Sequence, residues 1–434
     1  MATDDRPASL QAMMGSKGWF NRLKNTEVAK AMVDQKEANI AVGILSRASA
    51  FASDDVLQLI ETRWLPSKEF DGYAWFVLQE TLNWTGKHLS IATTIIKRSD
   101  IGPFAFDHIV STVGAAQPMI ALELVLVRLQ AKLEKAISDA EQRINSETTN
   151  GDNHLAHYVR GPLEALDALV DRSDGWDSLE ALAKAEPKAF LSMLWPWFHS
   201  ILAQYKRFMD DRGSLGFPLR YHLDFRFEEE DALGLGEKAL LGALRVATET
   251  FAAQDSEEFA EWLNRVEGED ATPAQRLFAN ALASQPARYA QRSFEFLTSD
   301  IRRFNLGNIE DLSGTTKRLI RVASPFWSDE QIIFFAKEVR SYSPRPPNDL
   351  EVKSRQHFYR AIEQLKLELL ESLPRERVST DLTKFIEEKR RKFGDAKRGA
   401  TFTGPTWVGS PMSTSEIGVA NDEDVINPGS RIRL

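Results

Sequence analysis

Two short strings in the sequence partly match the loop with which many proteins bind nucleotide phosphates. A phosphate-binding loop needs the pattern Gly-x-x-x-x-Gly-Lys-Ser/Thr, in which backbone N–H groups and one lysine hold the phosphates. The nearest string, TLNWTGKH at residues 81–88, lacks the first glycine and carries His88 where the magnesium-binding hydroxyl is needed. The string SGTTK at residues 313–317 has the right residue types in the wrong order. We therefore expect no such loop and no bound cofactor.

A metal site has one weak candidate. His154 and His157 are three residues apart, a spacing that places both rings on one side of a helix, and Asp152 lies close in sequence as an oxygen ligand. The chain has no cysteine and no second histidine pair, so polar residues at a helix start are the simpler interpretation. The lack of cysteine also excludes thiol nucleophiles and disulfides. His199 stands in an apolar run after Trp-Pro-Trp, and we expect a partly buried packing residue.

Acid–base catalysis has a candidate segment from Tyr221 to Asp231. It contains His222 and Asp224 and ends in four consecutive acids at residues 228–231. Paired carboxylates perform acid–base chemistry only when their surroundings separate their pKa values. The segment is polar, which gives no reason to expect such burial. An enzyme with a site assembled around these residues therefore remains the alternative, and no single catalytic residue is assigned.

Charge and hydropathy narrow the range of partners. The chain has 434 residues, with 63 acidic against 54 basic side chains and a formal net charge of −9. That balance argues against bulk electrostatic binding to nucleic acid or to an anionic membrane. The start lacks a secretory signal, and the most apolar stretch, residues 119–127, is too short for a bilayer and contains Glu123. We expect a cytoplasmic protein.

The elements that would position any site are helices. Residues 118–144 give the clearest pattern, because their apolar side chains recur every three or four positions along one stripe. Shorter helices are expected at residues 27–50, 54–64, 73–84, 89–98 and 104–113. Pairs of short amphipathic helices joined by tight turns are typical of helical repeats. The sequence therefore predicts an all-α fold, a degenerate HEAT-like α-solenoid array.

Capping chemistry marks several of these helix starts. Four pairs have the spacing of a capping box, in which two side chains satisfy free backbone N–H groups. They are Thr272 with Gln275, Ser328 with Gln331, Asp177 with Glu180, and Asp255 with Glu258. Pro273 follows the first of these predicted caps, and proline is well suited to the first helical position.

The chain contains ten tryptophans, which could form a ligand-binding surface or pack in the core. Trp64, Trp75 and Trp84 are spaced so that successive helices could face one interior. Large aromatic side chains in such a pattern dominate cores more often than ligand surfaces. We expect these three residues in the core.

Composition suggests four parts. Turn-rich stretches predict boundaries that divide the chain into residues 1–148, 149–225 and 226–393, each a helical unit. Residues 394–434 are rich in Gly, Ser, Thr and Pro and show no helical stripe. We interpret them as an extended or disordered tail.

Candidate partner-binding residues lie near the end of the chain. Arg390, Arg391 and Lys392 belong to a basic cluster that could contact phosphate, although a solvated helix end explains it better. Trp407 and Met412 are the apolar anchors that the tail could offer to a partner.

Several short segments together carry a family resemblance. They are Leu319-Ile320, Ser324-Pro325, LPRERVS at 373–379, RKFG at 391–394, VGSPM at 408–412 and DED at 422–424. In this order they resemble a helical region of large bacterial STAND-type, NACHT-like signalling NTPases, several of which act in antiphage defence. The resemblance implies a helical arm beside a nucleotide-binding module, in cis or in trans, with a protein partner.

None of that family's catalytic residues can be placed on this chain, because no Walker A lysine is present. We therefore expect a non-catalytic interaction or sensor region, part of or derived from such an NTPase. The alternatives are the enzyme described above and a purely structural spacer between domains.

Overall fold

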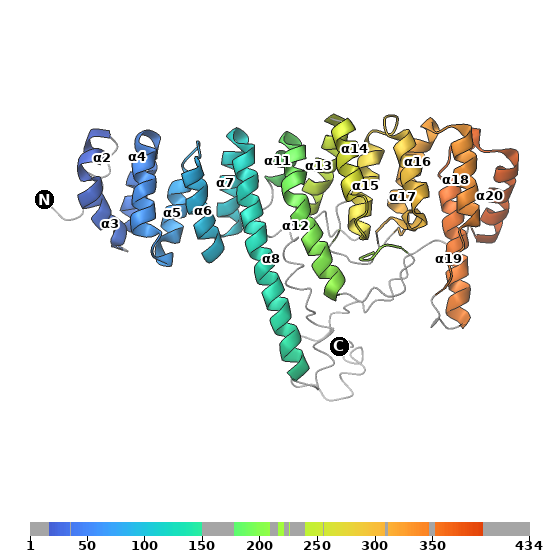
Figure 1. The fold of residues 1–434 in the computed structure, drawn as a ribbon, viewed down its shortest axis with the longest axis horizontal. Helices are drawn as coiled ribbons and strands as arrows, with labels where there is room; N and C mark the ends of the chain where they lie inside the picture. The colour runs from blue at the N-terminus through green and yellow to red at the C-terminus, as the bar shows by residue number, and fades with distance from the viewer. Residues whose placement is uncertain are drawn as a thin grey trace, which may run out of the picture. The chain divides into compact units, whose positions relative to one another are not determined.

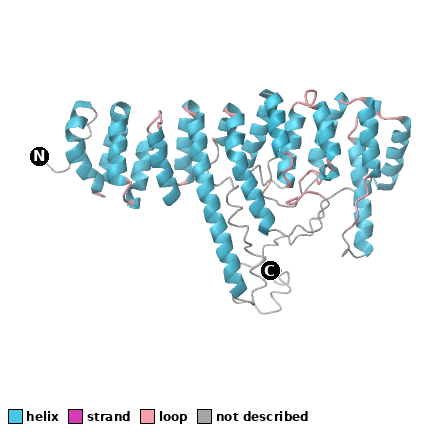
Figure 2. Ribbon diagram, in the orientation of Figure 1, coloured by secondary structure: helices cyan, strands magenta, loops and turns pink. Residues whose placement is uncertain are grey.

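The computed structural model describes residues 17–34, 36–149, 178–208, 216–220, 225, 239–254, 256–308, 311–346 and 352–393. Every regular element in these ranges is a helix (Figure 2). The predicted all-α fold is therefore confirmed, while the HEAT-like solenoid type stays a prediction. None of these helices has the length and hydrophobicity that crossing a bilayer requires.

The helices follow one another closely along the chain (Figure 1). In order they are α2 (Lys17–Leu23), η1 (Lys24–Val28), α3 (Ala29–Val33), α4 (Ala38–Leu59), η2 (Ile60–Trp64), η3 (Lys68–Phe70), α5 (Asp71–Gln79), α6 (Gly86–Arg98), α7 (Pro103–Ala116), α8 (Pro118–Thr149), α11 (Leu179–Ala185), α12 (Pro187–Phe208), α13 (Ala239–Gln254), α14 (Ser256–Val266), α15 (Thr272–Ser284), α16 (Ala290–Ser299), η5 (Ile301–Asn305), α17 (Gly314–Ala323), η6 (Ser324–Phe326), α18 (Asp329–Ser341), α19 (Val352–Glu371), η7 (Arg375–Arg377) and α20 (Thr380–Phe393).

The predicted boundaries of the first helices need two corrections. The helix expected at residues 27–50 is interrupted, because Asp34 has an extended backbone between α3 and α4. The gap expected between the predicted helices 27–50 and 54–64 is a kink within α4, and the helix does not end there. Ala52 leaves helical geometry with φ −144° and ψ 42°, and α4 continues to Leu59. Periodicity located the apolar face here but not the turns.

Packing in the C-terminal half follows an alternating rule. Helix α13 contacts both α11 and α15, α15 contacts α17, and α17 contacts α19. Helix α16 contacts α18, and it also contacts its chain neighbours α15 and α17, while α18 contacts α19. Each of the alternate helices from α11 to α19 thus packs on the next in that series, so apolar side chains are buried between helices that are not consecutive in the chain.

Contacts also cross the predicted internal boundaries. Helix α12 packs on α8 across residue 148, and α13 packs on α11 and α12 across residue 225. The contacts divide the chain only between residues 395 and 396. The tail predicted at 394–434 lies outside the described residues, and the internal boundaries stay predictions.

Tryptophans connect successive helices through the core. Trp64, Trp75 and Trp84 are all buried, which confirms the packing role expected for them. The indole N–H groups of four tryptophans donate to main-chain carbonyls of other helices, which satisfies their one polar atom inside the core. These pairs are Trp64 to Met32, Trp75 to Ala105, Trp197 to Leu129 and Trp327 to Ala290.

Of the four predicted capping boxes, the one at Ser328 is present, while Asp177 and Asp255 lie outside the described residues. Ser328 caps α18, with its hydroxyl accepting from the Gln331 N–H at 3.2 Å while the Gln331 side chain accepts from the Ser328 N–H at 2.8 Å. The box predicted at Thr272 is wrong. Thr272 already lies inside α15, and its hydroxyl donates instead to the carbonyl of Phe217 at 2.8 Å.

Candidate functional site

A single arginine joins the two connections that border α18 and α20. The Arg377 guanidinium donates to the carbonyl oxygens of Trp327 at 2.7 Å and Pro325 at 3.0 Å, and it pairs with Asp329 at 2.6 Å. Ser324-Pro325 and residues 373–379 are two of the segments that carry the family resemblance. The fold therefore brings them into direct contact, although Trp327 and Arg377 are 50 residues apart.

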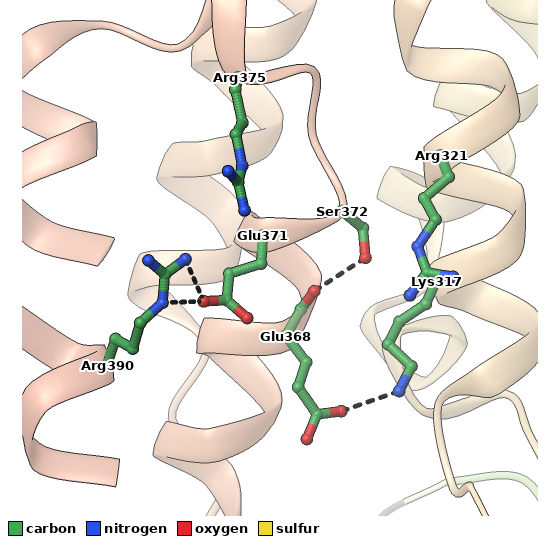
Figure 3. Close-up of a pocket in the computed structure, with 7 residues that line it drawn as sticks. All are labelled: Lys317, Arg321, Glu368, Glu371, Ser372, Arg375 and Arg390. Carbon is green, nitrogen blue, oxygen red and sulfur yellow. Dashed lines mark hydrogen bonds and ion pairs between the residues drawn. The ribbon is translucent and has the colours of Figure 1, made fainter. Parts of the chain in front are cut away.

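The η7 segment also contributes to a polar cavity of about 420 Å³, which we call the basic pocket (Figure 3). Helices α17, α19 and α20 supply its other walls. The lining residues are Lys317, Arg321, Glu368, Glu371, Ser372, Arg375 and Arg390. Four of these seven side chains are cations and two are carboxylates, so the pocket carries a positive balance within a chain of net charge −9.

Two of the four cations are neutralised inside the protein. Lys317 Nζ lies 3.1 Å from a carboxylate oxygen of Glu368 and 2.7 Å from one of Asp311. Arg390 pairs with Glu371 at 2.7 Å (Figure 3).

The other two cations are not neutralised. Arg321 and Arg375 are exposed, and neither has an ion pair or hydrogen bond with any residue that the structure describes. The basic pocket therefore presents two guanidinium groups without carboxylate partners.

The pocket wall formed by α20 is held on α19 by a second ion pair. Lys389 pairs with Glu363, which also accepts from Lys366 at 2.9 Å. Burial on its own raises the pKa of Glu363, but the hydrogen bonds from Lys389 and Lys366 outweigh it and hold this pKa below its ordinary value. The carboxylate is thus kept charged, and α20 is attached to α19 through two ion pairs, Lys389–Glu363 and Arg390–Glu371.

The chemistry available in the basic pocket is anion binding. Its one hydroxyl, that of Ser372, donates to the Glu368 carbonyl at 2.8 Å and is therefore already used inside the helix. Guanidinium groups are always charged and present paired N–H donors that match the oxygens of carboxylates and phosphates. The arrangement is suited to holding an anion in place.

A second cavity of about 490 Å³ lies between α18 and the η7–α20 segment, and we call it the apolar groove. Its apolar lining residues are Ile332, Ile333, Ala336, Val378 and Leu382. Of these, Ile333 is 65% exposed and is therefore open to contact from outside the protein.

The charges around the apolar groove are balanced. Arg340 pairs with Asp381 at 3.4 Å, and Arg377 pairs with Asp329. An apolar centre within a polar rim is the organisation of protein–protein interfaces.

The sequence-predicted basic cluster is divided by the fold. Arg390 lines the basic pocket, whereas Arg391 and Lys392 lie on the exposed surface of α20, and Lys392 pairs with Glu388 at 3.4 Å one turn away. The expected solvated face describes all three residues, since the Arg390 side chain is also 49% exposed, but of the three only Arg390 lines the basic pocket. Trp407 and Met412, the other predicted partner-binding residues, lie outside the described residues.

Of the four cations of the basic pocket, sequence reasoning indicated Arg390 and missed the other three. Lys317 belongs to the SGTTK string, which was set aside because its order does not fit a phosphate loop. Arg375 lies inside LPRERVS, one of the resembling segments, and Arg321 follows directly after another, Leu319-Ile320. The available signal was therefore a concentration of basic residues in and beside these segments.

The other sequence candidates do not add to the site. Of residues 221–231 the structure describes only Phe225, which is buried, and His154 and His157 lie outside the described residues. The expectation for His199 is wrong, because its side chain is 60% exposed and hydrogen-bonds to Glu269, itself 4% exposed. In the described part of the chain, no three His, Asp or Glu side chains are grouped to hold a metal ion.

No family model, no curated protein sequence and no solved structure matches this chain. The resemblance to STAND-type NTPases accordingly rests on the segments quoted above and on nothing else.

Proposed function

We propose that this chain is a non-catalytic helical interaction region, part of or derived from a bacterial STAND-type NTPase, that binds a protein partner in the cytoplasm. The observation that carries the proposal is the apolar groove between α18 and α20. Its lining combines the exposed Ile333 with charged residues, four of which form the ion pairs Arg340–Asp381 and Arg377–Asp329.

The groove suits an apolar side chain or a short amphipathic helix from a partner. Burying an exposed isoleucine contributes roughly 1.5–3 kcal/mol, and most of the binding energy of an interface comes from a few such central residues. The ion pairs Arg340–Asp381 and Arg377–Asp329 already satisfy their charges, so they can border a partner without leaving an unpaired charge at the interface.

A sensor role follows from where the groove lies. Arg377, which lines the groove, also holds the α17–α18 connection to the α19–α20 connection. A partner seated between α18 and α20 therefore acts on the junction formed by two of the resembling segments. In a STAND-type protein this is a route by which partner binding reaches an attached NTPase module.

Site-specific photo-cross-linking tests the proposal. A photoreactive phenylalanine at position 333 should yield a defined adduct with one protein in cells that express this chain natively. The matched control is position 104, because Phe104 is also a helical side chain and is 87% exposed, in α7. We expect no adduct of the same mass from position 104.

The adduct is then checked by direct binding. The captured protein, purified, should bind the unmodified chain, and Ile333→Asp should weaken that binding by at least about tenfold, whereas Phe104→Asp should not. Equal adducts from both positions, or unchanged affinity in Ile333→Asp, would show that the groove is not a partner site.

A further inference from the structure

The basic pocket concentrates positive charge that the protein itself does not neutralise. Lys317 and Arg390 have carboxylate partners in Glu368 and Glu371, whereas Arg321 and Arg375 have none in the described residues. Like charges brought together around one cavity repel each other, and in a chain of net charge −9 there is no general excess of basic residues to explain them. An anion in the cavity would offset that repulsion.

The walls of the pocket are already fixed. Arg375 belongs to η7, and two residues later Arg377 fastens this segment to the main chain of Pro325 and Trp327. A second contact holds α17 against α19, because Lys317 Nζ lies 3.1 Å from a carboxylate oxygen of Glu368. These anchors hold the backbone of the pocket walls in place before any ligand arrives, so the ordering cost of binding is confined to the exposed Arg321 and Arg375 side chains.

The lining indicates which part of a ligand is recognised. The seven lining residues include no aromatic and no aliphatic side chain, so no surface is present for a nucleobase or an apolar group. Two unpaired guanidinium groups favour a ligand with several closely spaced anionic oxygens. The cavity, at about 420 Å³, falls within the size range of small-ligand sites and is larger than one phosphate ion needs.

We propose that the basic pocket binds a small molecule bearing a diphosphate or longer phosphate chain, through Arg321 and Arg375 with support from Lys317 and Arg390. An acidic peptide fits less well, because peptide carboxylates are spread along a chain whose other groups would need an apolar wall. The proposal is independent of the apolar groove, which shares none of its lining residues with the pocket.

Titration calorimetry with pyrophosphate as the probe tests the inference. We expect saturable binding with one site per chain at low salt. Arg321→Gln and Arg375→Gln should each weaken it about tenfold or more, since a charge-assisted hydrogen bond is lost. Neither arginine has a partner in the described residues, so both variants should keep the melting temperature of the free protein.

The matched control is Arg391→Gln, which removes the same charge from the exposed surface of α20 beside Arg390. It should change the affinity less than about twofold. An equal loss in Arg391→Gln would show diffuse attraction to the basic helix end and would overturn the proposal. Saturable binding of acetate or of a glutamate-rich peptide as tight as that of pyrophosphate would overturn the phosphate assignment. Ile333→Asp should leave pyrophosphate binding unchanged, so this test and the test of the groove can fail separately.

Discussion

Arg302 and Arg303 are adjacent but differ in burial, so the same substitution at both positions measures how much burial contributes to the free energy of unfolding. The Arg303 side chain is 6% exposed and that of Arg302 is 42% exposed. Arg303 Nε donates to the Gln275 side chain at 2.9 Å, and Nη1 lies 2.8 Å from a carboxylate oxygen of Glu267. It also donates to the Phe296 carbonyl at 2.8 Å, and it thereby ties α16 and η5 to the start of α15.

Electrostatics at Arg303 show that the charge is retained against its surroundings. Burial lowers the pKa of Arg303, and the attraction of Glu267 opposes that shift. Arg302, in contrast, pairs in partly exposed positions with Asp300 at 2.8 Å and Asp270 at 2.7 Å.

The expected magnitudes follow from this difference. Arg303→Met removes the donors of a buried network while filling a similar volume, and breaking a buried ion pair from one side costs about 3–5 kcal/mol. Arg302→Met breaks exposed pairs, each of which contributes about 0.2–1 kcal/mol. We therefore expect Arg303→Met to destabilise the α14–α16 region by about 3 kcal/mol or more, and Arg302→Met by about 1 kcal/mol.

Hydrogen exchange of the backbone amides in α15 and α16 measures this free energy locally. Since every 1.4 kcal/mol is a factor of ten, exchange should become about a hundredfold faster in Arg303→Met and about fivefold faster in Arg302→Met. Equal acceleration in the two variants would refute the argument that burial of the network, and not the number of ion pairs, sets its contribution.

Two further predictions concern single positions. Burial lowers the pKa of His88 below its ordinary value of 6.5, although the negative charge of Asp54 acts in the opposite direction. The Nδ1 atom of His88 accepts a hydrogen bond from the Thr85 N–H at 3.0 Å. The unfolded chain therefore binds a proton that the folded site does not, so stability should fall as the pH drops below about 6.5. This pH dependence, followed by hydrogen exchange in α6, should be reduced in His88→Gln. The glutamine side chain can still accept from the Thr85 N–H, as His88 does in the capping box of α6. An unchanged profile would exclude His88 as its source. A Cβ at Gly307 would collide with the main chain of residues 311–313, whereas one at Gly268 would meet nothing within 4 Å. Gly307→Ala should thus lower the melting temperature by several degrees and Gly268→Ala should not, and similar melting curves would contradict this reading of the close approach.

Local sequence predicted those features whose partners are close along the chain. The capping box at Ser328 is confirmed because it needs only Gln331, three residues away. The same signal failed at Thr272, where the carbonyl of Phe217, 55 residues earlier, takes the hydroxyl hydrogen bond. His199 was misplaced for a similar reason, since its partner Glu269 is 70 residues distant. A pattern within one helix contains no information about such neighbours.

The sequence by itself determined the all-α fold, because apolar spacing of three and four residues specifies which face of each helix must be buried. It also indicated Arg390 as a candidate, through the density of basic residues around it. Only the tertiary structure separated Arg390 from Arg391, because α20 packs on α19 so that Arg390 pairs with Glu371 and lines the basic pocket, whereas Arg391 does not line it. The basic pocket likewise exists only once α17, α19, η7 and α20 are packed together, since its charges come from segments that no local interaction joins.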